Sequence, residues 1–288
     1  METNFDRPVT VMGILNLTGD SFYAGSRFLD GDGRPDLDAL QQKAAEMIAE
    51  GARILDLGAC STRPGSQAVG AAEEWRRLSP ALRCLRDAFP DTPLSIDTWW
   101  SEVILRATDA VGAVIVNDIS AGEDDPAMLS VAARNHLTYI AMHKRGTPAT
   151  MQGMTDYPAE GVPDGLSPVT AAVRRYFEAF AQRAQDAGLE DWILDPGFGF
   201  AKTVEQNWQL LRELSALRVP GRRMLVGISR KRFLWQPLGI SPEEALPATQ
   251  SAHLAALQGG ADILRVHDVA PAVQAVGVYR QLAGAGRQ

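Results

Sequence analysis

Short apolar runs recur along the chain, separated by longer stretches with helical periodicity. Eight such runs lie at 9–17, 54–59, 94–97, 113–117, 138–143, 192–195, 224–229 and 263–267. Each is mostly apolar on both of its faces, which is typical of strands covered from both sides in a parallel sheet. The pattern therefore predicts eight buried strands.

The stretches between the runs predict helices. Two of them place apolar residues at i, i+4, i+7 and i+11, which is one face of a helix. These positions are Val173, Phe177, Phe180 and Ala184 in one stretch and Leu78, Leu82, Leu85 and Phe89 in the other. Alternating strands and helices imply a parallel sheet. Eight such units in 288 residues fit a closed (β/α)8 TIM barrel, for which about 250 residues are typical.

An open doubly wound sheet is the alternative architecture. No linker rich in Pro, Gly or Ser divides the chain, so residues 1–288 are predicted to form a single α/β domain.

The charge, hydropathy and cysteine content argue against several classes of protein. The net charge of −7 argues against binding of nucleic acid by a basic surface. The apolar runs are far shorter than the roughly 20 residues that span a bilayer, and the polar segment 1–8 does not resemble a signal peptide. The two cysteines, Cys60 and Cys84, make neither a disulfide framework nor a metal site. We expect a cytoplasmic protein without a membrane or nucleic-acid partner.

Polar side chains end nearly every predicted strand. They are Asn16; Ser61, Thr62 and Arg63; Asp97; Asn117 and Asp118; His143 and Lys144; Asp195; Ser229, Arg230 and Lys231; and Arg265 and His267. The carboxyl ends of barrel strands meet at one rim, where the active sites of such barrels lie. This set therefore predicts a binding site for small molecules at that rim.

Arg265 and His267 are two residues apart, so strand alternation puts both side chains on one face. A guanidinium fork and an imidazole donor together suit an anion. The alternative is that Arg265 pairs with a structural carboxylate.

Three carboxylates, Asp97, Asp118 and Asp195, end strands. A pair of carboxylates could serve glycoside hydrolysis, or carboxylates could bind adjacent N–H groups such as those of a pterin or guanine. For Asp118 we favour a role as a cap of the segment that follows it.

Other polar features have plainer interpretations. The loops 18–33 and 61–66 are rich in turn-forming residues and are candidate lids or ordinary surface loops. Cys60 is interpreted as a buried filler rather than a reactive thiol, and His136 and His253 as structural residues of helices. The segment 197–202 lacks the third glycine of a dinucleotide fingerprint because Lys202 takes its place.

The motifs at the strand ends, taken in order, resemble those of the dihydropteroate synthase family. The segments that carry the resemblance are 12–18, 20–22, 61–65, 95–97, 116–120, 142–143, 146–148, 195–200, 227–231 and 265–268. The resemblance implies a (β/α)8 barrel and a transferase of folate biosynthesis that sulfonamides target. Its reaction joins (7,8-dihydropterin-6-yl)methyl diphosphate to 4-aminobenzoate and releases diphosphate. It also implies a possible homodimer formed through the late helices.

The resemblance assigns roles to residues of this chain. The pterin would be bound by Asp97, Asn117, Asp195, Lys231 and Arg265. The diphosphate would be bound by Asn16, Thr62, Arg265 and His267, with Mg²⁺ as the cofactor and Asn16 as its ligand. The 4-aminobenzoate would be bound by Phe28, Thr62, Arg63, Pro64, Phe200, Ser229 and Lys231. The catalytic residues would be Asp97, Lys231, Arg265 and His267.

The implied mechanism is SN1-like, through a pterin carbocation. The chain departs from the family pattern at three places. Gly19 stands where proline is common, and aspartate or glycine is common near Ala24. Cys60 stands where an acidic residue is common. Two other functions share part of the pattern: a pterin-binding methyltransferase domain and a non-catalytic pterin-binding paralogue.

Overall fold

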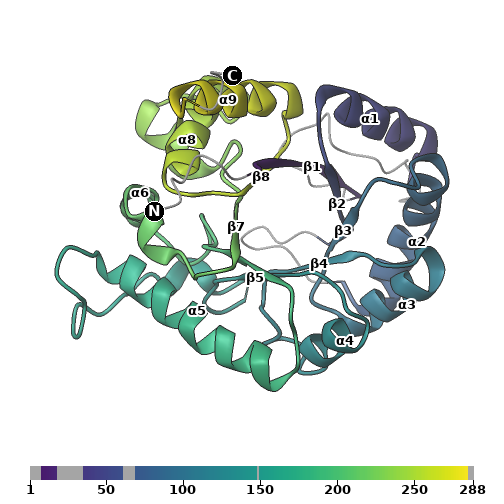
Figure 1. Cartoon of the computed structure of the whole chain (residues 1–288), viewed down its shortest axis with the longest axis horizontal. Helices are drawn as coiled ribbons and strands as arrows, with labels where there is room; N and C mark the ends of the chain where they lie inside the picture. Colours follow the sequence, from purple (N-terminus) through teal and green to yellow (C-terminus); the bar gives the residue numbers. More distant parts are fainter. Residues whose placement is uncertain (1–7, 18–34, 61–68, 148, 285–288) are drawn as a thin grey trace.

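Eight parallel strands close into a barrel in sequence order (Figure 1). The computed structural model describes residues 8–17, 35–60, 69–147 and 149–284. Its strands are β1 (Thr10–Asn16), β2 (Ile54–Gly58), β3 (Leu94–Asp97), β4 (Ile115–Asp118), β5 (Tyr139–Met142), β6 (Trp192–Asp195), β7 (Arg223–Val226) and β8 (Ile263–Val266). Because β8 pairs with β1, the closed TIM barrel is confirmed and the open sheet is wrong.

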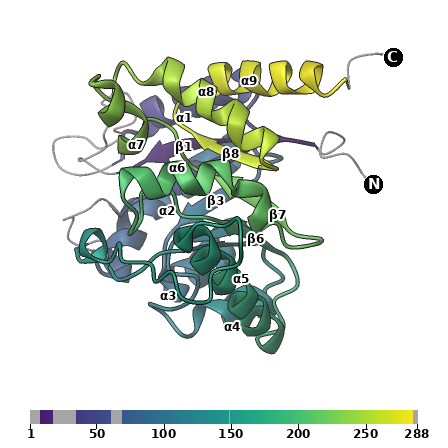
Figure 2. The same cartoon turned by 90° about the vertical axis from the view of Figure 1, so that its left-hand side faces the viewer.

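Helices form a ring outside the strands (Figure 1). The α-helices are α1 (Leu37–Glu50), α2 (Ala71–Ala88), α3 (Ser101–Val111), α4 (Met128–Arg134), α5 (Pro168–Asp186), α6 (Val204–Arg212), α7 (Arg232–Trp235), α8 (Leu246–Gln258) and α9 (Val269–Leu282). Short 3-10 turns occur at Met151–Gly153, Leu214–Leu217 and Gln236–Leu238. Figure 2 shows α8 and α9 lying together at one edge of the molecule.

The apolar stripes predicted for two helices face the core. On α5, Val173, Phe177, Phe180 and Ala184 are buried, and on α2 so are Leu78, Leu82 and Leu85. Phe89 is only partly buried, because it caps the end of α2 rather than belonging to it. Ser167 starts α5 by accepting a hydrogen bond from the Thr170 amide, and Pro168 occupies the first turn, where no amide donor is needed.

The interior of the barrel changes from apolar to polar along the strands. Its apolar layer consists of Met12, Ile54, Ile140, Ile193, Leu225 and Ile263, with Ile115 packed against it. Side chains of a strand alternate between faces, so the residue two positions later also points inward. On four strands that residue is polar, namely Asp56, Asn117, Asp195 and Arg265. A polar floor therefore lies directly above the apolar layer.

Two predicted elements end elsewhere than expected. The apolar run 224–229 predicts a long strand, but β7 ends at Val226. Ile228 is nevertheless fully buried, so apolar character continues after the backbone has left the sheet. His136 is not in a helix: it follows α4 with a φ of 51°, in the turn that leads to β5.

Candidate active site

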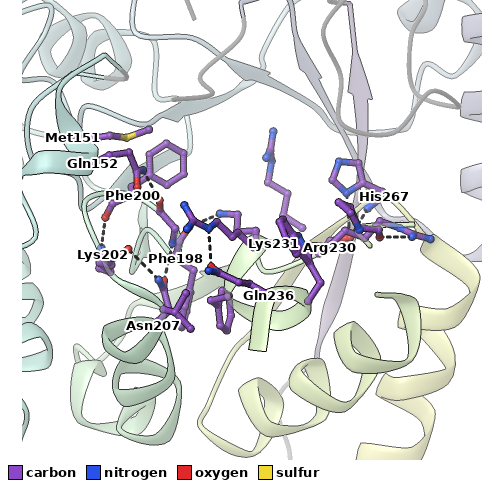
Figure 3. Close-up of a pocket in the computed structure, with 18 of the residues that line it drawn as sticks. Met151, Gln152, Phe198, Phe200, Lys202, Asn207, Arg230, Lys231, Gln236 and His267 are labelled. Atoms are coloured by element: carbon purple, nitrogen blue, oxygen red, sulfur yellow. Dashed lines mark hydrogen bonds between the residues drawn. The ribbon is translucent and has the colours of Figure 1, made fainter. Parts of the chain in front are cut away.

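A cavity of about 950 Å³ opens at the carboxyl ends of the strands. Seven of the residues predicted for the site line it: Asn16, Asp97, Phe200, Ser229, Lys231, Arg265 and His267. Figure 3 shows Lys231 between the segment of Phe198 and Phe200 on one side and His267 on the other. Asn117 and Asp195, also predicted, are buried beside these residues. Phe28, Thr62, Arg63 and Pro64 lie outside the described residues, as do Gly19 and Ala24.

Asp56 holds the polar floor together, although its sequence position did not mark it as a site residue. It is fully buried and accepts hydrogen bonds from Ser95 Oγ at 2.6 Å and Asn117 Nδ2 at 3.2 Å. Arg265 Nε donates to Asp56 Oδ2 at 2.7 Å. The sequence did contain a signal for this role. Asp56 is a carboxylate inside the apolar run 54–59, two positions after Ile54, whose side chain points into the barrel.

Arg265 also donates from Nη2 to Asp97 Oδ2 at 2.9 Å. The alternative interpretation, that Arg265 pairs with a buried carboxylate, is therefore observed: Arg265 is paired with both Asp56 and Asp97. Burial of the guanidinium lowers its pKa, but the negative charges of Asp56 and Asp97 outweigh this and the pKa of Arg265 is raised. The guanidinium is thus a fixed cation at the floor of the cavity.

Asp97 is a carboxyl group of the floor whose pKa is shifted strongly upward. Burial raises its pKa to about 7, although Arg265 acts in the opposite direction. Asp56, Asp118 and Asp195 add to the increase because their charges repel a further anion. Among the described residues, Asp97 Oδ1 is buried without a hydrogen-bond partner. One oxygen of Asp97 is therefore held by Arg265 while the other can accept a hydrogen bond from a ligand.

Lys231 and Asp195 are buried groups of opposite charge that influence each other electrostatically. Burial lowers the pKa of Lys231 to about 8, against the attraction of Asp195. Burial likewise raises the pKa of Asp195, whose Oδ1 accepts a hydrogen bond from the Gly197 amide at 2.8 Å. Lys231 Nζ donates to the Phe198 carbonyl at 2.5 Å and lies 5.0 Å from the ring centre of Phe200. Lys231 thus joins the pterin-binding candidates to the candidate aminobenzoate site.

His267 lies beside Ser229 at the rim. Its Nδ1 is 3.1 Å from Ser229 Oγ, which also accepts a hydrogen bond from the His267 amide at 3.3 Å. Burial and the nearby Arg265 lower the pKa of His267 to about 4. At neutral pH the imidazole is therefore neutral and offers one N–H.

Lys202 and His143 form a further buried cluster; His143 was predicted at the rim as a strand-end residue, whereas Lys202 was not predicted as a site residue. Lys202 Nζ contacts His143 Nδ1 at 3.0 Å and donates to the carbonyls of Gly197 at 2.9 Å and Phe200 at 3.0 Å. The pKa of His143 is far below its usual value, chiefly because of burial, so its ring nitrogen can accept. Asn207 Oδ1 accepts from the Gly199 amide. Together these contacts fix the segment that presents Phe200.

Two other predicted interpretations agree with the structure. Asp118 is structural: it accepts hydrogen bonds from the amides of Ser120 and Gly122 and from the Tyr139 hydroxyl. It caps a turn rather than a helix. Cys60 is buried at the cavity wall, and burial raises the pKa of its thiol to about 11, so it is not a reactive thiolate.

The described residues contain no cluster of three or more His, Cys, Asp or Glu side chains that could hold a metal ion. None of the helices in the described part of the chain has the length and apolar character needed to span a membrane.

A sequence profile of the family described as "Pterin binding enzyme" matches residues 12–267. The chain belongs to this family. It is 42% identical over 273 residues to the dihydropteroate synthase of Synechocystis sp., covering 93% of this chain and 89% of the relative.

Two solved dihydropteroate synthases share the fold. The enzyme from Yersinia pestis, solved in a sulfonamide drug complex, is 35% identical with a TM-score of 0.82, covering 98% of this chain and 96% of that one. The enzyme from Burkholderia cenocepacia, complexed with 7,8-dihydropteroate, is 39% identical with a TM-score of 0.79, covering 99% and 94%. The expected place among dihydropteroate synthases, and with it a transferase of folate synthesis, is confirmed.

Proposed function

We propose that the enzyme condenses (7,8-dihydropterin-6-yl)methyl diphosphate with 4-aminobenzoate to give 7,8-dihydropteroate and diphosphate. The observation that carries the proposal is the polar floor, in which Asp97, Arg265 and Lys231 meet below a cavity of about 950 Å³. The Burkholderia cenocepacia relative binds 7,8-dihydropteroate, the product of this reaction.

The buried floor suits the pterin ring. A pterin edge carries adjacent N–H donors, ring nitrogens and a carbonyl oxygen, so it needs acceptors and donors side by side. Asp97 and Asp195 supply carboxylate acceptors, Asn117 supplies an amide and Lys231 an ammonium. The unpartnered Oδ1 of Asp97 supports its assignment, because a ligand N–H would remove the cost of burying a bare acceptor.

The leaving diphosphate belongs at the rim, where Asn16, Arg265 and His267 line the cavity. Arg265 would lie against the pterin face and reach the diphosphate while Asp56 holds its Nε. The neutral His267 would donate one hydrogen bond. Thr62, assigned to the same anion, lies outside the described residues.

The donor set near Asn16 fits Mg²⁺. A Cβ atom added at Gly58 would lie 3.8 Å from both Asn16 Oδ1 and Asp97 Oδ2, an ordinary contact distance, so Gly58 places its backbone beside these two oxygens. Mg²⁺ prefers a few oxygen ligands from protein and substrate phosphates and retains several waters. When bound, Mg²⁺ would neutralise charge on the departing diphosphate. Asn16 would hold it by a single side-chain oxygen.

The 4-aminobenzoate site would lie on the outer side of Lys231. Phe200, 5.0 Å from Lys231 Nζ, would cover the aromatic ring, and Ser229 and Lys231 would bind the carboxylate. Phe28, Arg63 and Pro64 are assigned to this site by resemblance and lie outside the described residues.

The chemistry is displacement at the methylene carbon by an SN1-like route. The C–O bond to the diphosphate breaks first, and the electron pair leaves with the diphosphate. A fixed negative charge on Asp97 would stabilise the pterin cation, and Arg265 and His267 would stabilise the anion that departs. The arylamine nitrogen then forms the new C–N bond and loses one proton.

We also propose a homodimer formed through the late helices. On α9, Val278 is 51% exposed and Leu282 is 61% exposed, and they are four residues apart and so lie on one face of the helix. The adjacent α8 has no charged side chain along its length. Two copies of this face could cover each other.

The assay that tests the function is turnover by the purified protein with both substrates and Mg²⁺, followed by chromatography of dihydropteroate. Formation of dihydropteroate supports the synthase. Methyl transfer to a corrinoid would support the pterin-binding methyltransferase, and pterin binding without turnover would support the non-catalytic paralogue.

A further inference from the structure

Arg230 stands between two residues assigned to the site, Ser229 and Lys231, and lines the same cavity, but its guanidinium is bound to neighbouring segments of the protein (Figure 3). Its Nε and Nη2 donate to the two oxygens of Asp268 at 2.8 and 3.0 Å, a bidentate fork. Asp268 directly follows His267 in the sequence. The fork therefore joins the segment after β7 to the segment after β8.

The same guanidinium is tied to a third segment. Arg230 Nη1 donates to the carbonyls of Pro242 at 2.9 Å and Glu243 at 2.7 Å, in the connection between α7 and α8. The Arg230 amide donates to Thr249 Oγ1 at 3.1 Å. The Arg230 side chain is only 8% exposed and that of Asp268 15%. These contacts are thus sheltered from water, where a charged fork is stronger than on an open surface.

The backbone at Arg230 is also unusual. Its φ of 53° lies in the left-handed region, which is unfavourable for a residue with a Cβ atom. Such a conformation persists when the surrounding contacts determine it, and it is concentrated at functional sites. Here the conformation turns the chain so that Arg230 points to Asp268 while Lys231 points to the Phe198 carbonyl.

We propose that Arg230 and Asp268 form a positioning pair that fixes Lys231 relative to His267. The inference rests on the proposed function and adds residues that act through others rather than on the substrates. Lys231 and His267 reach the cavity from the segments that follow β7 and β8, and in the proposed function they bind different parts of the substrate. A rigid link between their neighbours sets the distance between the pterin-binding ammonium and the imidazole at the leaving group.

The test compares Arg230→Lys and Asp268→Asn with a matched control, Arg86→Lys. Arg86 donates to the carbonyls of Val111, Pro90, Thr92 and Ala113, and so clasps loops through a guanidinium in the same way. It lies in the last turn of α2, at the amino-terminal end of the barrel, and does not line the cavity. Each variant is assayed for kcat, KM and melting temperature, with turnover measured well below the melting transition.

We expect Arg230→Lys and Asp268→Asn to lose about 10- to 100-fold in kcat/KM, the size of effect that a misplacement near 1 Å produces. Most of the loss should be in kcat. The double variant should be little worse than either single one, because both remove the same link. Arg86→Lys should lose stability while keeping its kcat/KM. If all three variants lose stability and keep kcat/KM, the pair is merely structural and the proposal is wrong.

A second readout keeps the inference separate from the proposed function. In ¹³C-histidine NMR, with the His267 signal assigned through His267→Asn, Arg230→Lys should shift or broaden that signal, and Arg86→Lys should not. An inactive wild-type protein would refute the proposed function alone, since the NMR arm would still decide the positioning role. An unchanged His267 signal in Arg230→Lys would overturn the inference even in an active enzyme.

Discussion

Replacing Asp97 by asparagine removes one negative charge from the floor of the cavity and keeps the shape of the side chain. Asp97 is 8% exposed, and its Oδ2 accepts a hydrogen bond from Arg265 at 2.9 Å. In the proposed mechanism this charge stabilises the developing pterin cation. Loss of one preorganised electrostatic contact typically costs about 10²- to 10³-fold in rate, or about 2.7–4 kcal/mol. We expect a decrease in kcat of that size.

The fold should survive this change. Arg265 keeps its contacts with Asp56, whose Oδ2 is 2.5 Å from Nη2 and 2.7 Å from Nε. Removing one partner of a buried pair is most costly, about 3–5 kcal/mol, when the other charge is left uncompensated, and here it is not. The raised pKa of Asp97 also shows that burial disfavours its charge. We therefore expect a loss of less than about 2 kcal/mol in the free energy of unfolding.

Asp118→Asn is the matched control, since Asp118 is a buried carboxylate at the end of the adjacent strand. Its Oδ2 accepts hydrogen bonds from the Tyr139 hydroxyl at 2.6 Å and the Gly122 amide at 2.8 Å, so an amide NH₂ there would face donors. This control should lose about 1–3 kcal/mol of stability and little kcat. Turnover is measured by product chromatography and stability by urea unfolding. Near-normal kcat in well-folded Asp97→Asn would refute the role of its charge.

Other expected outcomes concern binding and assembly. Arg265→Ala and His267→Ala should weaken binding of the pterin diphosphate far more than binding of the pterin alcohol; equal losses in calorimetry would assign both residues to the pterin or the fold. Diphosphate with Mg²⁺ should tighten 4-aminobenzoate binding by about 1–3 kcal/mol, the usual size of coupling between sites, and an unchanged affinity would mean that the second site is preformed. Val278→Glu should convert a dimer to a monomer in light scattering, and a monomeric wild type would contradict the proposed interface.

Much of the site could be predicted because each barrel strand presents its polar residue at the same rim. Asn16, Asp97 and Arg265 were recognisable from position alone, since each ends or nearly ends an apolar run. The local pattern contains no information about partners that are distant in sequence. Asp56 and Arg265 are 209 residues apart and meet only because the barrel closes between β1 and β8.

The supporting contacts were harder to predict for a related reason. Lys202 appeared in the sequence only as the residue that breaks a glycine fingerprint. Its function depends on three acceptors, His143 Nδ1 and the carbonyls of Gly197 and Phe200, that converge only in the folded chain. The end of β7 was misjudged because the buried Ile228 continues the apolar pattern beyond the last ladder residue. An apolar run indicates that residues are buried, but it does not show whether their backbone is paired in the sheet.

The pH dependence of kcat/KM tests the electrostatics of the floor directly, because this ratio reports the pKa values of the free enzyme. Asp97, with a pKa of about 7, must lose its proton to stabilise a cation. Lys231, with a pKa of about 8, must keep its proton to act as an ammonium donor. Activity should therefore rise through about pH 7, fall above about pH 8 and pass through a narrow maximum between them.

Two other buried groups have pKa values in the same range as Asp97, so their effects on the pH profile must be distinguished from its effect. Burial raises the pKa of Glu74 to about 7 and lowers that of Lys202 to about 7. Because the folded pKa of Glu74 exceeds its unfolded value of 4.5, its contribution to stability is fully present below pH 4.5 and is lost as the pH rises toward 7. Glu74→Gln should therefore flatten the pH dependence of the unfolding free energy in that window and leave the acidic limb of kcat/KM in place. In Asp97→Asn, the activity that remains should no longer decrease on the acidic side of the kcat/KM profile. If instead the acidic limb persists in Asp97→Asn and disappears in Glu74→Gln, the charge that governs catalysis is that of Glu74 on α2, and the assignment of Asp97 is wrong.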